Sequence, residues 1–165
     1  MTLEPPFDVI DSPLGPVLVA GTDAGLHEIR FLLGDGAAPA PPTGRDPAAL
    51  ADATGQLRAY FAGELTVFDL PRAPTGTLFQ RGVWEAVAAV PFGQIASYGQ
   101  IARTVGRPNA SRAVGAANGA NPLPIVVPCH RIVGSTGTLT GFRGGIRLKR
   151  WLLQHEGSAS LSLFD

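Results

Sequence analysis

The chain has a single cysteine, Cys129, and the next residue is His130. A thiol beside an imidazole can act as a nucleophile, because transfer of its proton to a base yields the reactive thiolate. With one cysteine, the chain can form neither an intrachain disulfide nor a thiolate-rich metal site. Two interpretations remain: an inert buried thiol, which is the usual state of a free cysteine, and an activated nucleophile.

An acidic residue that could orient the histidine comes near the end of the chain. Glu156 is the first carboxylate after Glu85, and eight basic residues lie between the two. A helix is expected over residues 147–156, with an apolar face formed by Leu148, Trp151, Leu152 and His155. Because Glu156 borders this face, it can turn inward and hold the imidazole, as in sites where a third group orients the base. The alternative is a solvated glutamate at a helix end.

Three prolines, Pro122, Pro124 and Pro128, precede Cys129. Each favours extended geometry in the residue before it, so the approach to the cysteine is expected to be stiff and strand-like. Neighbouring side chains of a strand point to opposite faces. His130 can therefore take the Cys129 proton only if the chain bends after Pro128 or if a water bridges the two side chains.

The elements that position these residues differ between the two halves of the chain. In the first half, runs at residues 7–11, 16–20 and 26–32 predict three short strands. The pair Asp46-Pro47 predicts the N-cap and first position of a helix. The first half therefore has the pattern of a small β-sheet with one helix.

From residue 77 the pattern changes to helices with short breaks. They are expected over residues 78–90, from a capping box at Ser97 to Gly106, and over 110–118 with Asn109 as N-cap. The last two are joined by a short turn and suggest a helix-turn-helix. The alternative is a set of ordinary core helices.

The expected helix over residues 110–118 carries mostly small side chains, and Arg112 and Asn118 are its only long or amide side chains. These are too few for readout of base edges in the major groove. Small residues permit instead a close approach to the DNA backbone or the minor groove, with Arg112 protruding. We therefore expect binding through phosphate contacts, with little sequence preference.

Charge divides the chain although its net charge is zero. Residues 1–75 hold four arginines and ten acidic residues, whereas residues 76–165 hold nine basic residues and three acidic ones. We expect two domains with these boundaries, an N-terminal structural domain and a C-terminal domain that binds DNA, a polyanion; the alternative is that the two halves pair with each other. No apolar run approaches the ~20 residues of a membrane span, no signal peptide is evident, and the free thiol indicates the cytoplasm.

Four segments together resemble the methylated-DNA–protein-cysteine methyltransferases, also called O6-alkylguanine-DNA alkyltransferases. The segments are residues 97–102, 111–115, 121–131, which contains Pro-Cys-His-Arg, and 152–156. The resemblance covers roughly residues 77–157 and, more loosely, the region before them. It implies an α+β fold: a small antiparallel β-sheet with a helix, of the ribonuclease H-like type, followed by a helical domain with a helix-turn-helix that carries the active-site cysteine.

The resemblance implies a role for each catalytic residue. Cys129 would accept the alkyl group from O6 of guanine, and less readily from O4 of thymine, in a single displacement. His130 would remove the thiol proton through a water, and Glu156 would orient His130. Asn121 would brace the active-site turn, and Tyr98 would donate a proton or hydrogen bond to N3 of the departing guanine.

Further residues are implied in contacts with DNA and with the base. Arg112 would fill the space of a flipped nucleotide in the minor groove. The other expected DNA contacts are Ser111, Tyr98, Ala113 and Asn118. The guanine pocket would be formed by Pro124, Ile132, Phe142 and Arg143. In it, the carbonyls of Cys129 and Ile132 would accept from the guanine amino group, and the Arg143 N–H would donate to O6. Phe142 and Arg143 replace the tyrosine and the small residue common in relatives, which leaves the substrate range open.

The function implied is single-turnover repair of double-stranded DNA that contains O6-alkylguanine, because an S-alkylcysteine thioether is a stable product. No cofactor and no metal are implied. We expect a bacterial, cytoplasmic monomer, with cooperative binding on DNA left open. Three alternatives remain. A DNA binder of the alkyltransferase-like class would lack the acceptor thiol, a cysteine hydrolase would need an oxyanion hole, and a helix-turn-helix regulator would need a helix that reads bases.

Overall fold

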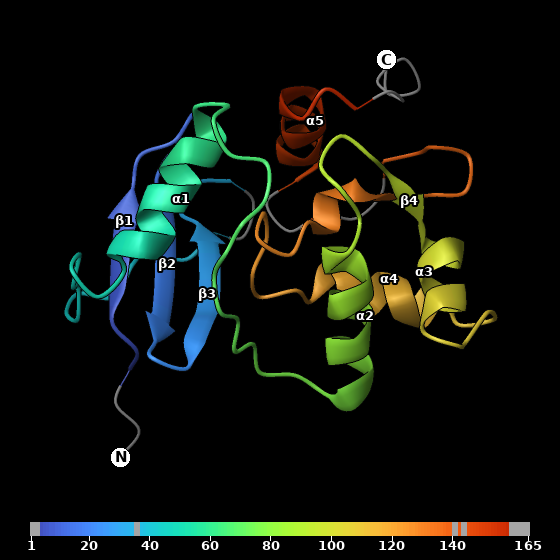
Figure 1. Ribbon diagram of the computed structural model, residues 1–165, viewed down its shortest axis with the longest axis horizontal. Coiled ribbons are helices and arrows are strands. Elements are labelled where there is room, and N and C mark those ends of the chain that lie inside the picture. Colours follow the sequence, from blue (N-terminus) through green and yellow to red (C-terminus); the bar gives the residue numbers. More distant parts are fainter. Residues whose placement is uncertain (1–3, 35–36, 140–141, 143–144, 159–165) are drawn as a thin grey trace. The chain divides into compact units, whose positions relative to one another are not determined.

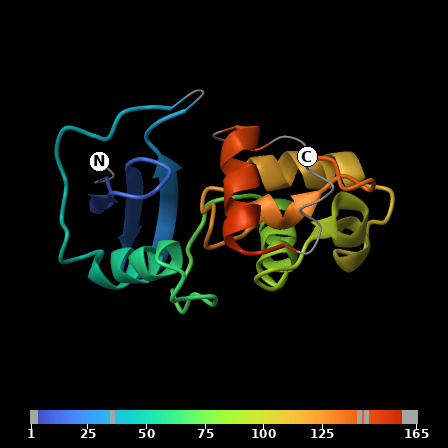
Figure 2. The ribbon, with the colours of Figure 1, turned by 90° about the horizontal axis from the view of Figure 1, so that it is seen from above.

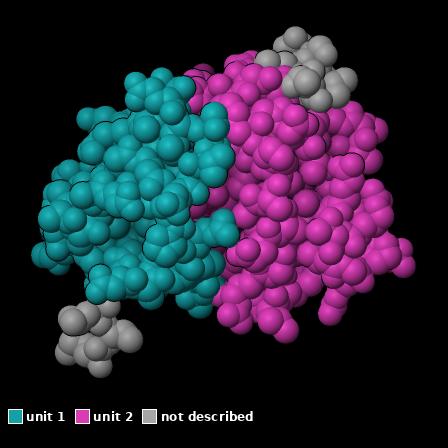
Figure 3. All heavy atoms as spheres, in the orientation of Figure 1, with its two compact units in different colours: residues 1–75 teal, residues 76–165 magenta. Residues whose placement is uncertain are grey.

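The structure is a computed structural model that describes residues 4–34, 37–139, 142 and 145–158. The chain divides into two compact units, Met1–Thr75 and Gly76–Asp165 (Figure 3). The first is a small sheet with a helix and the second is mainly helical, so the α+β class expected from the sequence is confirmed. Among the residues described, no helix is long and apolar enough to cross a membrane.

The first unit contains an antiparallel sheet of three strands in the order β1-β2-β3, at Phe7–Ile10, Val17–Thr22 and Gly25–Phe31. Helix α1, Ala51–Phe61, lies along the sheet (Figure 2). Side chains of β2 are buried on both of its faces, and on one face Leu18 packs with hydrophobic residues of β1 and of the segment after β3. The three predicted strands are confirmed.

Helix α1 begins later than the sequence predicted. Residues 47–50 form turns, and Asp46 Oδ1 accepts a hydrogen bond from the Ala49 N–H at 3.2 Å. Asp46 therefore caps a turn and not the helix. The N-cap of α1 is Leu50, whose side chain makes no capping hydrogen bond.

The second unit packs helices α2, α3 and α4 against one another (Figure 1). Its elements in chain order are α2 (Leu78–Ala88), β4 (Ala96–Ser97), α3 (Tyr98–Thr104), α4 (Ser111–Gly119), the 3₁₀ turn η1 (Cys129–Arg131), β5 (Ile132–Val133) and α5 (Ile146–His155). Strands β4 and β5 pair in parallel and hold the start of α3 beside the segment that follows Cys129. The fully buried side chains of the three packed helices include Val83, Val87, Ala102 and Val114.

The starts of α3 and α4 show one correct and one incorrect prediction. Ser97 Oγ accepts from the Gln100 N–H at 3.1 Å, and Gln100 Oε1 accepts from the Ser97 N–H at 2.8 Å, so the predicted capping box is confirmed. The N-cap of α4 is Ala110 and not Asn109. The Ala110 N–H donates to the Arg107 carbonyl at 2.9 Å, which extends the turn by one residue and leaves Asn109 inside it.

Candidate active site

Cys129 follows a closed loop and not a strand. Residues 122–127 form turns and bends, so the strand-like approach suggested by the prolines is wrong. The cause is the side chain of Asn121. Its Nδ2 donates to the Val127 carbonyl at 2.8 Å, and its Oδ1 accepts from the Leu123 N–H at 2.9 Å. One buried amide group thus ties both ends of the loop together.

The chain bends directly after Pro128. Residues Cys129–Arg131 form η1, in which the Arg131 N–H donates to the Pro128 carbonyl at 2.9 Å. This bend is one of the two conditions under which His130 can act on the thiol of Cys129. Cys129 is only 5% exposed, and His130 is fully buried.

His130 and Arg131 share one buried carboxylate. His130 Nε2 lies 2.8 Å from Glu156 Oε2, and Glu156 is the residue that ends α5. Arg131 binds the same carboxylate at both oxygens, with Nε 2.7 Å from Oε1 and Nη2 3.0 Å from Oε2. Its Nη1 also donates to the Val90 carbonyl at 2.6 Å. Sequence reasoning placed Glu156 against His130 but missed Arg131, whose signal was its position directly after His130.

The buried face of α5 is shifted by one position from the predicted face. In α5 and its C-cap, the buried residues are Lys149, Leu152, Leu153 and Glu156, and the half-buried ones include Leu148, Trp151 and His155. Trp151 instead stacks on His155, with ring centres 4.8 Å apart. Glu156 therefore lies on the same buried face, seven residues after Lys149, and its carboxylate points into the protein.

Burial and hydrogen bonding determine the charge of each group. Burial raises the pKa of the Cys129 thiol, and hydrogen bonds offset part of this rise. Burial lowers the pKa of His130 below its ordinary value of 6.5, and Glu156 opposes that effect. For Glu156, burial acts to raise the pKa, but hydrogen bonds from His130 and Arg131 outweigh burial and lower the pKa to about 2. The resting site holds a neutral thiol, a neutral imidazole and a carboxylate.

The two nitrogens of the His130 ring have different surroundings. Nε2 is engaged by the Glu156 carboxylate, which therefore fixes a proton on Nε2 of the neutral ring. Nδ1 is buried, and no described residue hydrogen-bonds to it. The neutral ring thus offers Nδ1 as a proton acceptor, which is the state that a general base requires.

A buried lysine lies beside the same site. Lys149 is fully buried; its Nζ donates to the Ile132 carbonyl at 2.6 Å and lies 6.0 Å from the ring centre of Tyr98. Burial lowers its pKa to about 8, and the negative charge that Cys129 carries as a thiolate acts against that shift. The positive charge of Lys149 in turn lowers the pKa of Cys129. Sequence reasoning missed this residue, although it is the single lysine of the chain.

Helix α4 has an exposed end and a buried end. Ser111, Arg112 and Ala113 are exposed, as a DNA-binding surface requires. Asn118 is 3% exposed, and its Nδ2 donates to the Cys129 carbonyl at 3.2 Å. The prediction that Asn118 contacts DNA is therefore wrong. Six residues after Arg112, the helix has turned its side chain inward.

The residues expected around the base lie mostly within the described structure. Of the residues expected to form the guanine pocket, Pro124 and Ile132 are buried and Phe142 is half-buried. Arg143 lies outside the described residues, and Tyr98 is half-buried at the start of α3. The Cys129 carbonyl already accepts hydrogen bonds from Asn118 Nδ2 and from the Ile132 N–H, and the Ile132 carbonyl accepts one from Lys149 Nζ.

Comparisons with known proteins agree on one family. Residues 7–74 match the ribonuclease-like domain of 6-O-methylguanine DNA methyltransferase, and residues 78–158 match its DNA-binding domain. The chain belongs to the methylated-DNA–protein-cysteine methyltransferase family. A protein of that name from Methanosarcina acetivorans is 45% identical over 153 residues, which cover 92% of this chain and 98% of that protein. Another, from Mycobacterium bovis, is 48% identical over 162 residues, covering 96% and 98%.

Solved structures of the family agree with the fold. The crystal structure of Mycobacterium tuberculosis O6-methylguanine methyltransferase has a TM-score of 0.83 and 47% sequence identity, and the match covers 97% of this chain and 99% of that one. The crystal structure of the M. tuberculosis protein in complex with DNA has a TM-score of 0.81 and 47% identity, covering 96% and 99%.

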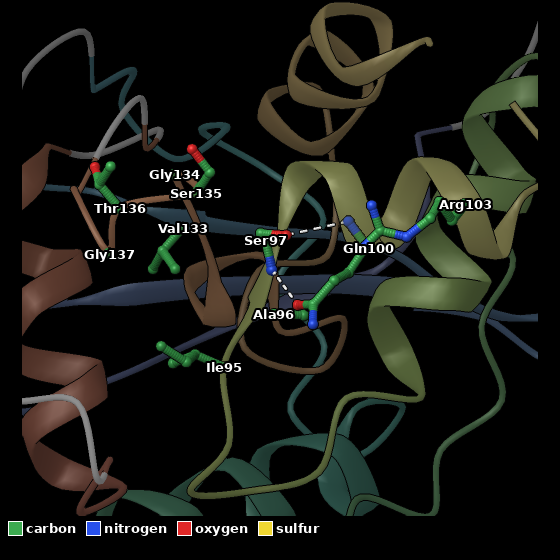
Figure 4. Close-up of a pocket in the computed structure, with 10 residues that line it drawn as sticks. All are labelled: Ile95, Ala96, Ser97, Gln100, Arg103, Val133, Gly134, Ser135, Thr136 and Gly137. Carbon is green, nitrogen blue, oxygen red and sulfur yellow. Dashed lines mark hydrogen bonds between the residues drawn. The ribbon is translucent and has the colours of Figure 1, made fainter. Parts of the chain in front are cut away.

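This member of the methyltransferase family also has a polar pocket of about 500 Å³ beside α3 (Figure 4). The N-cap Ser97 and the α3 residues Gln100 and Arg103 line it on one side, and Ser135 and Thr136 line it from the turn after β5. Its lining includes one cation and no carboxylate, so the pocket favours an anion. Among the described residues, no group of three or more His, Cys, Asp or Glu side chains is placed to hold a metal ion.

Proposed function

We propose that this chain repairs DNA by transferring an alkyl group from O6 of guanine to its own Cys129. The relatives with 45% and 48% identity are named methylated-DNA–protein-cysteine methyltransferases. The observation that carries the proposal is a buried thiol beside His130, whose imidazole lies 2.8 Å from the Glu156 carboxylate. These groups supply a nucleophile, a base and the acid that holds the base.

The transfer begins with removal of the Cys129 proton. His130 Nδ1 takes this proton through one bridging water, and Glu156 stabilises the imidazolium that results. The sulfur then bonds to the alkyl carbon while the bond between that carbon and O6 breaks, and the electron pair passes to the guanine. Tyr98 donates a hydrogen bond to N3 of the departing base. Because the thioether is stable, each chain reacts once.

The alkylated base leaves the duplex before it reacts. A thiol on a residue that is 5% exposed cannot reach O6 in a stacked base, and extrusion of a base costs a few kcal/mol. Exposed Arg112 enters the gap from the minor groove, and the small side chains of Ser111 and Ala113 let α4 approach closely. Arg103, in the polar pocket, offers an anion site for the DNA backbone. Backbone contacts of this kind carry little sequence preference.

Two other functions are less well supported. A non-enzymatic binder of alkylated DNA has no need of an acceptor thiol, whereas Cys129 is present within a network that can activate it. A cysteine hydrolase could use the same three side chains, but the family comparisons do not favour it. We further propose that the free protein is a monomer and acts in the cytoplasm, where a free thiol stays reduced.

Intact-mass measurement tests the proposed reaction. After incubation with excess duplex DNA that contains O6-methylguanine, the protein should gain the mass of one methyl group per chain, and peptide mapping should place it on Cys129. The Cys129→Ser variant should bind the same DNA and gain no mass. Unmodified wild-type protein that still binds the DNA would contradict the proposal and support the non-enzymatic binder.

A further inference from the structure

A lysine is buried beside the turn that carries Cys129. Lys149, the single lysine of the chain, lies on α5 and is fully buried. Its Nζ donates at 2.6 Å to the carbonyl of Ile132, the third residue after Cys129. Lysine is among the residues least often fully buried, because the removal of an ammonium group from water is unfavourable. The position of Lys149 beside the nucleophile therefore calls for a functional explanation.

The same lysine is close to the side chain proposed to hold the departing base. Its Nζ lies 6.0 Å from the ring centre of Tyr98, at the start of α3. The pairing of β4 with β5 holds the start of α3 beside Ile132, so one ammonium group reaches both places. Lys149 is thus near the turn that carries the nucleophile and near the residue that would contact the leaving group.

The charged groups around Cys129 act in different directions. The Glu156 carboxylate is bound by Arg131 at both oxygens. His130 is neutral at rest and becomes positive only when it takes the thiol proton. Lys149 is positive below about pH 8, and its charge acts to lower the pKa of Cys129. It also acts to lower the pKa of His130, an effect that Glu156 opposes.

We propose that the ammonium group of Lys149 stabilises the Cys129 thiolate, and then the negative charge that passes to the guanine, and so accelerates the transfer. The inference rests on the proposed alkyl transfer and adds an electrostatic role for a residue of α5. In that reaction the thiol proton goes to His130, the sulfur bonds to the alkyl carbon, and the bond from that carbon to O6 breaks. A fixed cation in a buried site favours these charged stages over the neutral thiol without reorganisation.

Reaction of Cys129 with iodoacetamide in the absence of DNA measures the thiolate, which is the nucleophilic form. Because the chain has one cysteine, the intact mass reports on Cys129 alone. Lys149→Met removes the charge and the hydrogen-bond donor, whereas Lys149→Gln removes the charge and keeps an N–H donor. At neutral pH both variants should react about tenfold more slowly than wild type, which corresponds to about one unit in the pKa of the thiol. At about pH 9 the difference should shrink to about twofold, because Lys149 of the wild type has then lost its proton.

A packing variant of the same helix is the control. Leu153→Ala removes a fully buried side chain and no charge, so any loss of rate should be the same at both pH values. The inference is overturned if Lys149→Gln reacts like wild type, or if the difference from wild type does not change with pH. If both Lys149 variants fail to fold in a thermal melt, the wild-type profile decides. Its rate should rise up to about pH 8 and then level off, and an unbroken tenfold rise per pH unit would overturn the inference.

Methyl transfer from duplex DNA that contains O6-methylguanine separates this inference from the proposed function. Lys149→Gln should lower the single-turnover transfer rate at least about tenfold at neutral pH, since the same thiolate is used. Equal transfer rates in Lys149→Gln and wild type would refute only the role of Lys149. No transfer by the wild-type protein would refute the proposed function itself.

Discussion

At the scale of single residues, the reactivity of the site depends on removal of the Cys129 proton. Burial raises the pKa of the thiol and lowers the pKa of His130. Burial alone would therefore leave an unreactive pair. Glu156 works against this, because it acts to raise the pKa of His130 and so strengthens it as a base. Arg131 keeps Glu156 ionised for that task, through two hydrogen bonds to its carboxylate.

These shifts predict the pH dependence of the wild-type reaction. His130 with a lowered pKa stays neutral at and somewhat below its ordinary value of 6.5, and it becomes protonated only in more acidic solution. The transfer rate should accordingly stay level from neutral pH down to about 6.5 and fall only below it. Glu156→Gln removes the carboxylate that raises the His130 pKa, so the acid limb should move to still lower pH. The rate at neutral pH should fall roughly tenfold to a hundredfold because the base is weaker.

Single-turnover rates across pH, with DNA affinity as the control, check this prediction. The affinity of Glu156→Gln for DNA should equal that of wild type, since Glu156 is buried. Equal transfer rates in the two proteins would refute the orienting role of the carboxylate.

At the scale of elements, α4 connects the proposed DNA-binding surface to the turn that carries Cys129. Its exposed end carries Arg112, and its buried end carries Asn118, which binds the Cys129 carbonyl. Trp84 of α2 donates from Nε1 to the Ala117 carbonyl at 2.8 Å and fixes the position of that buried end. The helix is therefore held from inside the unit, while the side chains at its start stay free to contact DNA.

Loss of Arg112 should affect duplex DNA more than the free base. Arg112→Ala removes the side chain that fills the gap left by the flipped nucleotide, so transfer from O6-methylguanine in a duplex should fall at least about tenfold. Transfer from the free base should stay near the wild-type rate. Arg81→Ala, which removes an exposed arginine of α2, is the control for loss of charge and should change duplex transfer little. A proportionate loss on duplex and free base would defeat the flipping role.

At the scale of the whole molecule, the two units carry opposite charge. The nine basic and three acidic residues of 76–165 contrast with four basic and ten acidic residues in 1–75. The second unit holds the helix-turn-helix and Cys129, and its exposed cations include Arg103, Arg107 and Arg112. Affinity for DNA therefore depends on the charge of this unit and not on the net charge of the chain.

Salt should weaken DNA binding strongly. With about four phosphate contacts, an increase from about 50 to 200 mM monovalent salt should lower the affinity about a hundredfold, because bound counterions are released on association. Transfer from free O6-methylguanine base should change little over the same range. Titration of a fluorescent duplex at several salt concentrations measures the slope. An affinity independent of salt would rule out phosphate contacts as the main source of binding.

Local signals determined those parts of the fold that were predicted correctly. The three strands of the first unit and the capping box at Ser97 depend on neighbouring residues, and both are confirmed. The predicted caps at Asp46 and Asn109 are wrong because turn hydrogen bonds compete for the same backbone groups. The strand-like approach to Cys129 is wrong because one side chain, Asn121, closes the loop.

The sequence by itself determined the reacting group and its helpers: one cysteine, the histidine after it, and one acidic residue in a long basic stretch. Only the tertiary structure decided how these groups are held. Glu156 meets His130 across 26 positions of chain, and Lys149 and Asn118 reach the backbone of the same turn from two different helices. No local pattern encodes such contacts, because burial and hydrogen-bond partners depend on how the helices pack.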